Sequence, residues 1–148
     1  MPKTTLDAMP VGAVAPALGS FTSLNASGAV TVSTPALIGY GAGAGGTVVQ
    51  ATSKTTAVTL NKPTGRIETN IAALAAGAEV QIICNNSLVS ANDITDCTVN
   101  GTGANSTFYR VRTISGAGVI YFQLTNISGL SLSDVVVIHF AVIKGAST

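Results

Sequence analysis

Apolar and polar side chains alternate in short runs along much of the chain, and residues 134–144 (DVVVIHFAVIK) form the most hydrophobic run. As a strand, this run has two apolar faces. One carries Val136, Ile138, Phe140 and Val142, and the other carries Val135, Val137, His139, Ala141 and Ile143. The pattern therefore predicts a central strand that is covered on both sides, as in the middle of a sandwich or at an oligomer contact. A helix is the competing interpretation of a short apolar run, but the density of Val and Ile favours a strand.

Similar but weaker runs predict seven further strands, separated by residues typical of turns. They cover residues 47–50, 56–60, 66–70, 79–84, 97–100, 107–114 and 119–125. The last two form a hairpin through residues 115–118 (SGAG), and residues 61–65 (NKPTG) form a turn in which Gly65 is free to take a positive φ. Residues 71–78 supply one helical turn that ends at Gly77. The fold class predicted is all-β, an antiparallel β-sandwich or jelly roll with about eight short strands.

The first part of the chain has a different character. Residues 1–46 carry four prolines among Ala, Gly and Ser, and end in GAGAGG, a pattern that disfavours helix and central strand. We therefore expect two parts, an extended N-terminal arm (1–46) and a β-sandwich domain (47–148). The arm is expected to become ordered mainly by docking on another molecule, or alternatively to pack on its own domain. Its candidate contact residues are Phe21, Leu24, Leu37, Ile38 and Tyr40.

The composition changes this picture at the surface. Charged residues make up 9% of the 148, against roughly 25% in an ordinary soluble domain, and the mean hydropathy is +0.51. We infer that other subunits cover much of the surface. The net charge of +1, with scattered basic residues, predicts no nucleic-acid or membrane partner. No apolar run approaches the roughly 18 residues of a membrane span, and no signal-peptide pattern is evident, so synthesis and folding in the cytoplasm are expected.

Few residues suggest chemistry. His139 is the single histidine, and without a nucleophile motif a structural or contact role is expected. Asp93 and Asp96 could ligate calcium, but turn formation and capping are the expected roles. Cys84 and Cys97 fit no zinc motif, and a buried free thiol is expected at Cys84, with a disulfide as the alternative. The prediction is therefore no catalytic residue, no cofactor and no metal.

The hairpin offers a candidate contact surface. Alternation turns Tyr109 and Val111 toward the core, and sends to the outer face Arg110, Arg112, Tyr121 and Gln123. Arg and Tyr are enriched in protein interfaces, which favours a protein-contact patch. A plain solvated face is the alternative, because Arg is mostly exposed in any protein.

Four segments resemble the head decoration, or cement, proteins of tailed bacteriophages. They are 46–62 (GTVVQATSKTTAVTLNK), 65–70 (GRIETN), 72–77 (AALAAG) and 130–145 (LSLSDVVVIHFAVIKG). The resemblance implies a β-sandwich or jelly-roll module on the outer surface of a virion head. It would self-associate as a homodimer or homotrimer and bridge subunits of the major capsid protein.

Two other functions are weighed against this one. A tail-fibre, spike or receptor-binding virion module would be expected to expose aromatic residues on its loops. The aromatic content of 5% and the lack of Trp weaken that hypothesis. A small glycan-acting enzyme is the more distant alternative, because the acids are scattered and the histidine stands alone.

Overall fold

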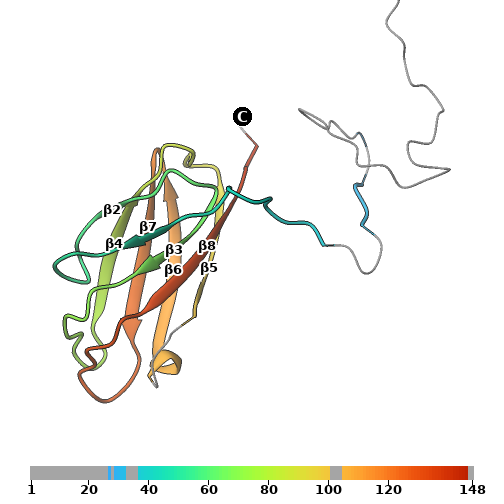
Figure 1. Ribbon diagram of the computed structural model, residues 1–148. Helices are drawn as coiled ribbons and strands as arrows, with labels where there is room; N and C mark the ends of the chain where they lie inside the picture. The colour runs from blue at the N-terminus through green and yellow to red at the C-terminus, as the bar shows by residue number, and fades with distance from the viewer. Residues whose placement is uncertain (1–26, 28, 33–36, 101–104, 147–148) are drawn as a thin grey trace, which may run out of the picture. The chain divides into compact units, whose positions relative to one another are not determined.

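Eight strands form two four-stranded sheets in the computed structural model, which describes residues 27, 29–32, 37–100 and 105–146 (Figure 1). The strands are β1 (Thr47–Val49), β2 (Val58–Thr59), β3 (Thr64–Glu68), β4 (Glu79–Asn85), β5 (Ile94–Val99), β6 (Tyr109–Gly116), β7 (Val119–Asn126) and β8 (Val137–Ile143). One short 3-10 helix, η1 (Ser106–Phe108), precedes β6. The all-β prediction is confirmed for the described residues, and so is the number of strands.

The strand order separates the two sheets. One runs β1-β3-β8-β5 and is called here the β8 sheet; the other runs β2-β4-β7-β6 and is called the β7 sheet. The chain passes from one sheet to the other at every connection except the β6–β7 hairpin. Buried side chains from both sheets form one core, and the Phe122 and Phe140 rings meet edge to face with centroids 5.7 Å apart. The arrangement is therefore β-sandwich-like.

The prediction of an antiparallel fold is only partly correct. Four of the six strand pairings are antiparallel, but β1 pairs with β3 and β2 pairs with β4 in parallel. Between the members of each parallel pair the chain visits the other sheet. It then returns in the same direction, as a crossover connection requires. The antiparallel part of the prediction is therefore corrected at these two pairs, and the jelly-roll topology stays a prediction.

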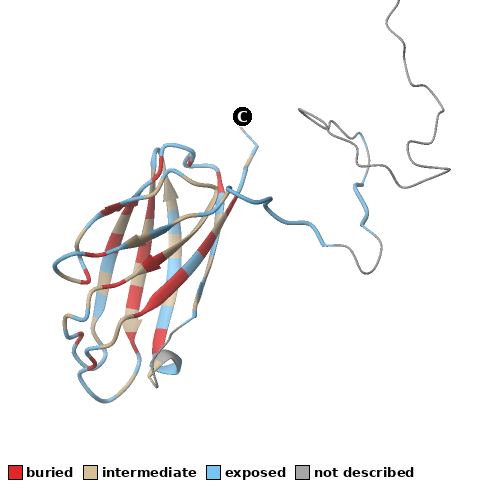
Figure 2. Ribbon diagram, in the orientation of Figure 1, coloured by how far each residue is buried: buried red, intermediate tan, exposed pale blue. Residues whose placement is uncertain are grey.

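The central position of the hydrophobic run is confirmed, because β8 lies between β3 and β5. Cover on both sides was also predicted, either in the middle of a sandwich or at an oligomer contact. Within one copy the core covers the Ile138 face, and cover of the other face by another subunit stays a prediction. The Ile138 face is buried, whereas His139 and Ile143 on the opposite face are exposed. Figure 2 shows both buried and exposed positions along β8. The core lies on one side of the β8 sheet. On the second face Val137 is 1% exposed and Ala141 is half-buried, so this face meets solvent mainly at His139 and Ile143.

Three local predictions need correction. The helical turn at 71–78 is absent: Leu74 and Leu132 exchange backbone hydrogen bonds of 2.8 and 3.0 Å, and Leu74 is buried. Burial of this leucine outweighs the weak tendency of a single turn to form helix. Strand β5 begins at Ile94, inside the segment expected to be a loop. Gly65 lies within β3, and the glycines that take positive φ are Gly43, Gly77 and Gly118.

Contacts divide the chain into two units, Met1–Ile38 and Gly39–Thr148. In the first, Leu37 and Ile38 are 93% and 78% exposed, whereas Phe21 and Leu24 lie outside the described residues. In the second, the residues just before β1 contact the strands. The Tyr40 hydroxyl donates to the carbonyl of Val142, and the backbone N–H of Arg66 donates to the carbonyl of Gly46. The last residues of the predicted arm thus pack with the sandwich.

Candidate protein-contact surfaces

The outer face of the β6–β7 hairpin gathers the four residues predicted there. In the antiparallel register Arg112 lies opposite Gln123, and Ile114 opposite Tyr121. Arg110 and Arg112 are exposed and Tyr121 and Gln123 are half-buried. The residues with the opposite orientation are buried or packed against the core: Tyr109, Val111, Ile120, Phe122 and Leu124. The predicted inward and outward alternation of the hairpin is therefore confirmed, whereas its role in binding remains a prediction.

An acidic residue from β4 joins this face. Arg112 Nη2 lies 3.5 Å from Glu79 Oε1, and the Thr125 hydroxyl donates to Glu79 Oε2 at 2.9 Å. Strands β4 and β6 flank β7, so this ion pair spans β7. Both of its side chains are largely exposed, so the pair contributes at most about 1 kcal/mol. A partner protein could therefore pair with Arg112 in place of Glu79 at little cost in stability.

The outer face of the β8 sheet is a second candidate surface, and sequence reasoning did not select its residues. The strand register sets them in rows across β3, β8 and β5. One row is Thr64, Ala141 and Asp96, and the next is Arg66, His139 and Thr98. The exposed pair Ile94 and Ile143 ends this face. The signal was the second apolar face of residues 134–144, for which the sequence predicted cover in the middle of a sandwich or at an oligomer contact.

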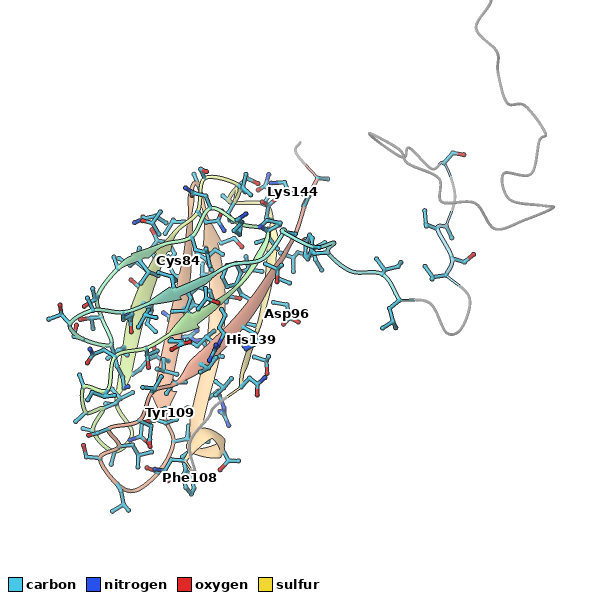
Figure 3. The ribbon with its side chains drawn as sticks, viewed as in Figure 1. Cys84, Asp96, Phe108, Tyr109, His139 and Lys144 are labelled. Carbon is cyan, nitrogen blue, oxygen red and sulfur yellow. The ribbon has the colours of Figure 1, made fainter. Side chains whose placement is uncertain are left out.

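An open hollow of about 230 Å³ lies on this face, beside Ala141. Its lining is Thr64, Asp96, Cys97, Thr98, His139, Phe140 and Ala141. Ala141 has a single methyl group, so it leaves space among its longer neighbours. Figure 3 shows His139 and Asp96 on the neighbouring strands β8 and β5. Within the described residues His139 makes no ion pair and no side-chain hydrogen bond.

Cysteine, histidine and aspartate in one hollow suggest a catalytic triad, but the strand alternation separates them. Cys97 lies opposite Phe140, which faces the core, whereas His139 lies opposite Thr98 on the outer face. The thiol and the imidazole therefore point to opposite sides of the sheet. Burial and the neighbouring Asp96 carboxylate raise the pKa of Cys97, which disfavours the thiolate.

Both cysteines are free thiols. Cys84 is buried, as the sequence predicted, and burial raises its pKa to about 11. The alternative, a disulfide between Cys84 and Cys97, is not formed. Cys97 is half-buried against the same core.

A second hollow, of about 400 Å³, opens between the edge strands β5 and β6. It is lined by Cys97, Thr98, Val99, Thr107, Tyr109, Arg110 and Val111. Farther along these strands, the Thr113 hydroxyl donates to the Thr95 carbonyl at 2.6 Å and links the two sheets. The hollow is thus an opening between the sheets at one edge, next to Arg110 of the candidate hairpin face.

Asp93 has a capping role, as predicted. Its Oδ2 accepts hydrogen bonds from Lys144 Nζ at 2.6 Å and from the Ser90 N–H at 2.8 Å, and its Oδ1 accepts one from the Gly145 N–H at 3.0 Å. Lys144 above all, then the backbone donors, hold the pKa of this carboxyl far below its usual range. The carboxylate closes the loop before β5 onto the segment after β8. The described residues contain no group of three or more His, Cys, Asp or Glu side chains that could hold a metal ion.

Lys54 is a polar core residue that sequence reasoning missed. It is 3% exposed, and its ammonium donates to the carbonyls of Asn70 and Asp134 at 2.5 and 2.6 Å. The Thr69 hydroxyl lies 3.3 Å away. Burial lowers the pKa of Lys54, and the nearby Asp134 charge opposes this shift. The ammonium ties the loop after β1 to the ends of two strands of the β8 sheet, which is a structural role.

Comparison with protein-family models, with curated proteins and with solved structures gave no match. None of the helical structure in the described residues has the length and apolar character that a membrane-crossing helix needs.

Proposed function

We propose that this protein decorates and stabilises the head of a tailed bacteriophage by non-covalent contacts. The observation that carries the proposal is the exposed face of the β8 sheet. Ile94 and Ile143 are 61% and 57% exposed there, in a chain with only 9% charged residues. The two side chains lie opposite each other at the end of a face that otherwise carries mainly polar and charged residues, and exposed apolar side chains that lie together are typical of a surface that another protein covers.

The partners in this proposal are other copies of the chain and the major capsid protein. The β-sandwich, proposed to be a jelly roll, forms the body of the subunit, and residues 1–38 form the extended arm that reaches a neighbour. The outer faces of the two sheets supply further contacts. Several weak contacts on one particle add through effective concentration, so that each can be small. The protein is proposed to lie on the outer surface of the virion and to act without catalysis.

The test is binding to empty heads assembled from the major capsid protein encoded in the same genome. We expect saturable binding at a fixed number of copies per capsomer, and shells that resist heating better than bare shells. Arg110→Glu reverses a charge on the hairpin face and should weaken binding to the shells if this face is a contact. Lys62→Glu, elsewhere on the sandwich, is its charge-matched control. The proposed function is overturned if no copies bind to the shells at high protein concentration. Density on the tail in virion images would favour the receptor-binding alternative.

A further inference from the structure

The residues around Ala141 form a surface that is complementary to itself. His139 and Ala141 are two positions apart on the outer face of β8, so a projecting imidazole lies next to a hollow. Two positions along a strand are about 6.6 Å. A two-fold axis in the plane of contact, crossing β8 between these positions, would bring two β8 strands face to face and antiparallel. Each imidazole would then enter the hollow of the other copy.

We propose that the chain forms a homodimer through this face, with His139 seated over the partner's Ala141 and beside the partner's Asp96. Asp96 is the direct cross-strand neighbour of Ala141, so its carboxylate borders the hollow that receives the imidazole. The proposal rests on the self-association part of the proposed function and names the surface that performs it.

The charges on this face agree with such a contact. The two-fold axis places the row Arg66, His139 and Thr98 of one copy against the row Thr64, Ala141 and Asp96 of the other. Arg66 would then face the partner's Thr64, and Asp96 would face the partner's Thr98. No like charges meet in this arrangement. Arg66 is moreover paired with Glu68 on its own strand at 3.0 Å. Isologous contacts of this type use one patch on both subunits.

The size of the face sets the expected strength. The strands β1, β3, β8 and β5 have 3, 5, 7 and 6 residues. At about 3.3 Å per residue and about 4.8 Å between strands, they present roughly 330 Å² in projection. That is small beside the roughly 800 Å² per partner of a standard interface. We therefore expect a weak dimer in solution, measurable by sedimentation at protein concentrations from about 1 µM to about 1 mM. On a particle the same contact would be reinforced by the others.

The first test fills the hollow. Ala141→Glu places a carboxylate beside Asp96 and excludes the partner's imidazole, and we expect the dimer dissociation constant to rise at least about tenfold. The matched control is Gln81→Glu, the same added charge at an exposed position of β4 on the outer face of the other sheet. It should leave the constant unchanged. Circular dichroism verifies that each variant is folded.

The second test exchanges the two partners. His139→Asp sets two carboxylates against each other and should weaken the dimer, and adding Asp96→His should restore it. A wild-type chain that stays monomeric at about 1 mM overturns the proposal. So does an Ala141→Glu variant that dimerises like the wild type, or an association that disappears only when residues 1–38 are removed.

Shell binding is measured on the same variants, so that the two proposals fail separately. Loss of the dimer in Ala141→Glu, together with a wild-type chain that ignores phage shells, supports the interface and removes the decoration function. Normal decoration by a wild-type chain that never dimerises supports the function and removes the interface.

Discussion

Gly65 lies directly opposite Phe140 in the β3–β8 ladder, and the Phe140 ring occupies the space that a side chain at position 65 would need. A Cβ at this position would lie 2.8 Å from Phe140 Cε1 and 2.5 Å from Leu60 Cδ2. The glycine is therefore required for close packing and not for an unusual backbone conformation.

Gly65→Ala should lower the free energy of unfolding by about 1–3 kcal/mol, because the added methyl group overpacks the core between Leu60 and Phe140. Urea denaturation measures the change. Gly129→Ala is the control, since no atom lies within 4 Å of a Cβ at that position, and its effect should stay within about 0.5 kcal/mol. Equal stability of the two variants would contradict the packing role.

Residue roles could be predicted where they depend on strand alternation alone. Alternation correctly turned Tyr109 toward the core and Arg112 to the outer face, and it predicted the buried thiol at Cys84. It could not predict Lys54, because burial of that ammonium depends on carbonyls 16 and 80 residues away in sequence. Sequence reasoning also explained Gly65 by a turn with a positive φ. The actual reason is the Phe140 ring, which comes from a strand distant in sequence and could not be foreseen.

At the scale of elements, β8 is the strand on which the β8 sheet depends. Ile138→Asp places a carboxylate at a fully buried position, opposite Ile67 on one side and Val99 on the other. The cost of burying that charge exceeds the whole stability of a typical domain of about 5–15 kcal/mol unless the group is protonated, so we expect no soluble folded protein.

His139→Asp is the matched control for this substitution, because the neighbouring side chain faces outward and is exposed. It should fold with normal circular dichroism. Cooperative unfolding of soluble Ile138→Asp at wild-type urea concentrations would rule out the central role of β8.

The segment after β8 is held by Asp93, and this contact should respond to acid. The folded-state pKa of Asp93 lies below its ordinary value near 4, so the contact stabilises the fold above that pH. Its contribution is lost as the pH falls below about 4 toward the folded-state pKa. Asp93→Asn should therefore be less stable than the wild type at pH 7, and the difference should shrink as the pH falls below 4.

Urea denaturation at a series of pH values measures this difference. Asp96→Asn is the control, because it removes an exposed carboxylate three residues away, in β5, and keeps the contacts of Asp93. A difference between Asp93→Asn and the wild type that is constant from pH 7 to about pH 3 would show that the carboxylate charge is not responsible.

At the scale of the whole molecule, the sandwich begins before its first strand. Deletion of residues 1–38 keeps the contacts of Tyr40 and Gly46, so the free energy of unfolding should change by less than about 0.5 kcal/mol. Deletion of residues 1–46 removes both, at about 0.5–1.5 kcal/mol for each hydrogen bond. The two truncated chains are compared by urea denaturation, and equal stability would show that residues 39–46 contribute nothing.

The same deletions test the arm. If residues 1–38 contact the capsid, the chain that lacks them should stay folded and lose binding to phage shells. Full decoration by the shorter chain would remove the arm from the proposed function and leave the outer faces of the two sheets as the contact surfaces.

The sequence by itself determined the all-β class, the eight strands, the central place of β8 and the inward and outward residues of the hairpin. These features follow from side-chain direction, which alternates along a strand whatever the strand pairs with. The tertiary structure decided the parallel pairings of β1 with β3 and of β2 with β4, the bridge between Leu74 and Leu132, and the burial of Lys54. Each of these depends on contacts between distant segments. It also left His139 and Ile143 exposed on the second face of β8, because the core lies on the other side of the sheet.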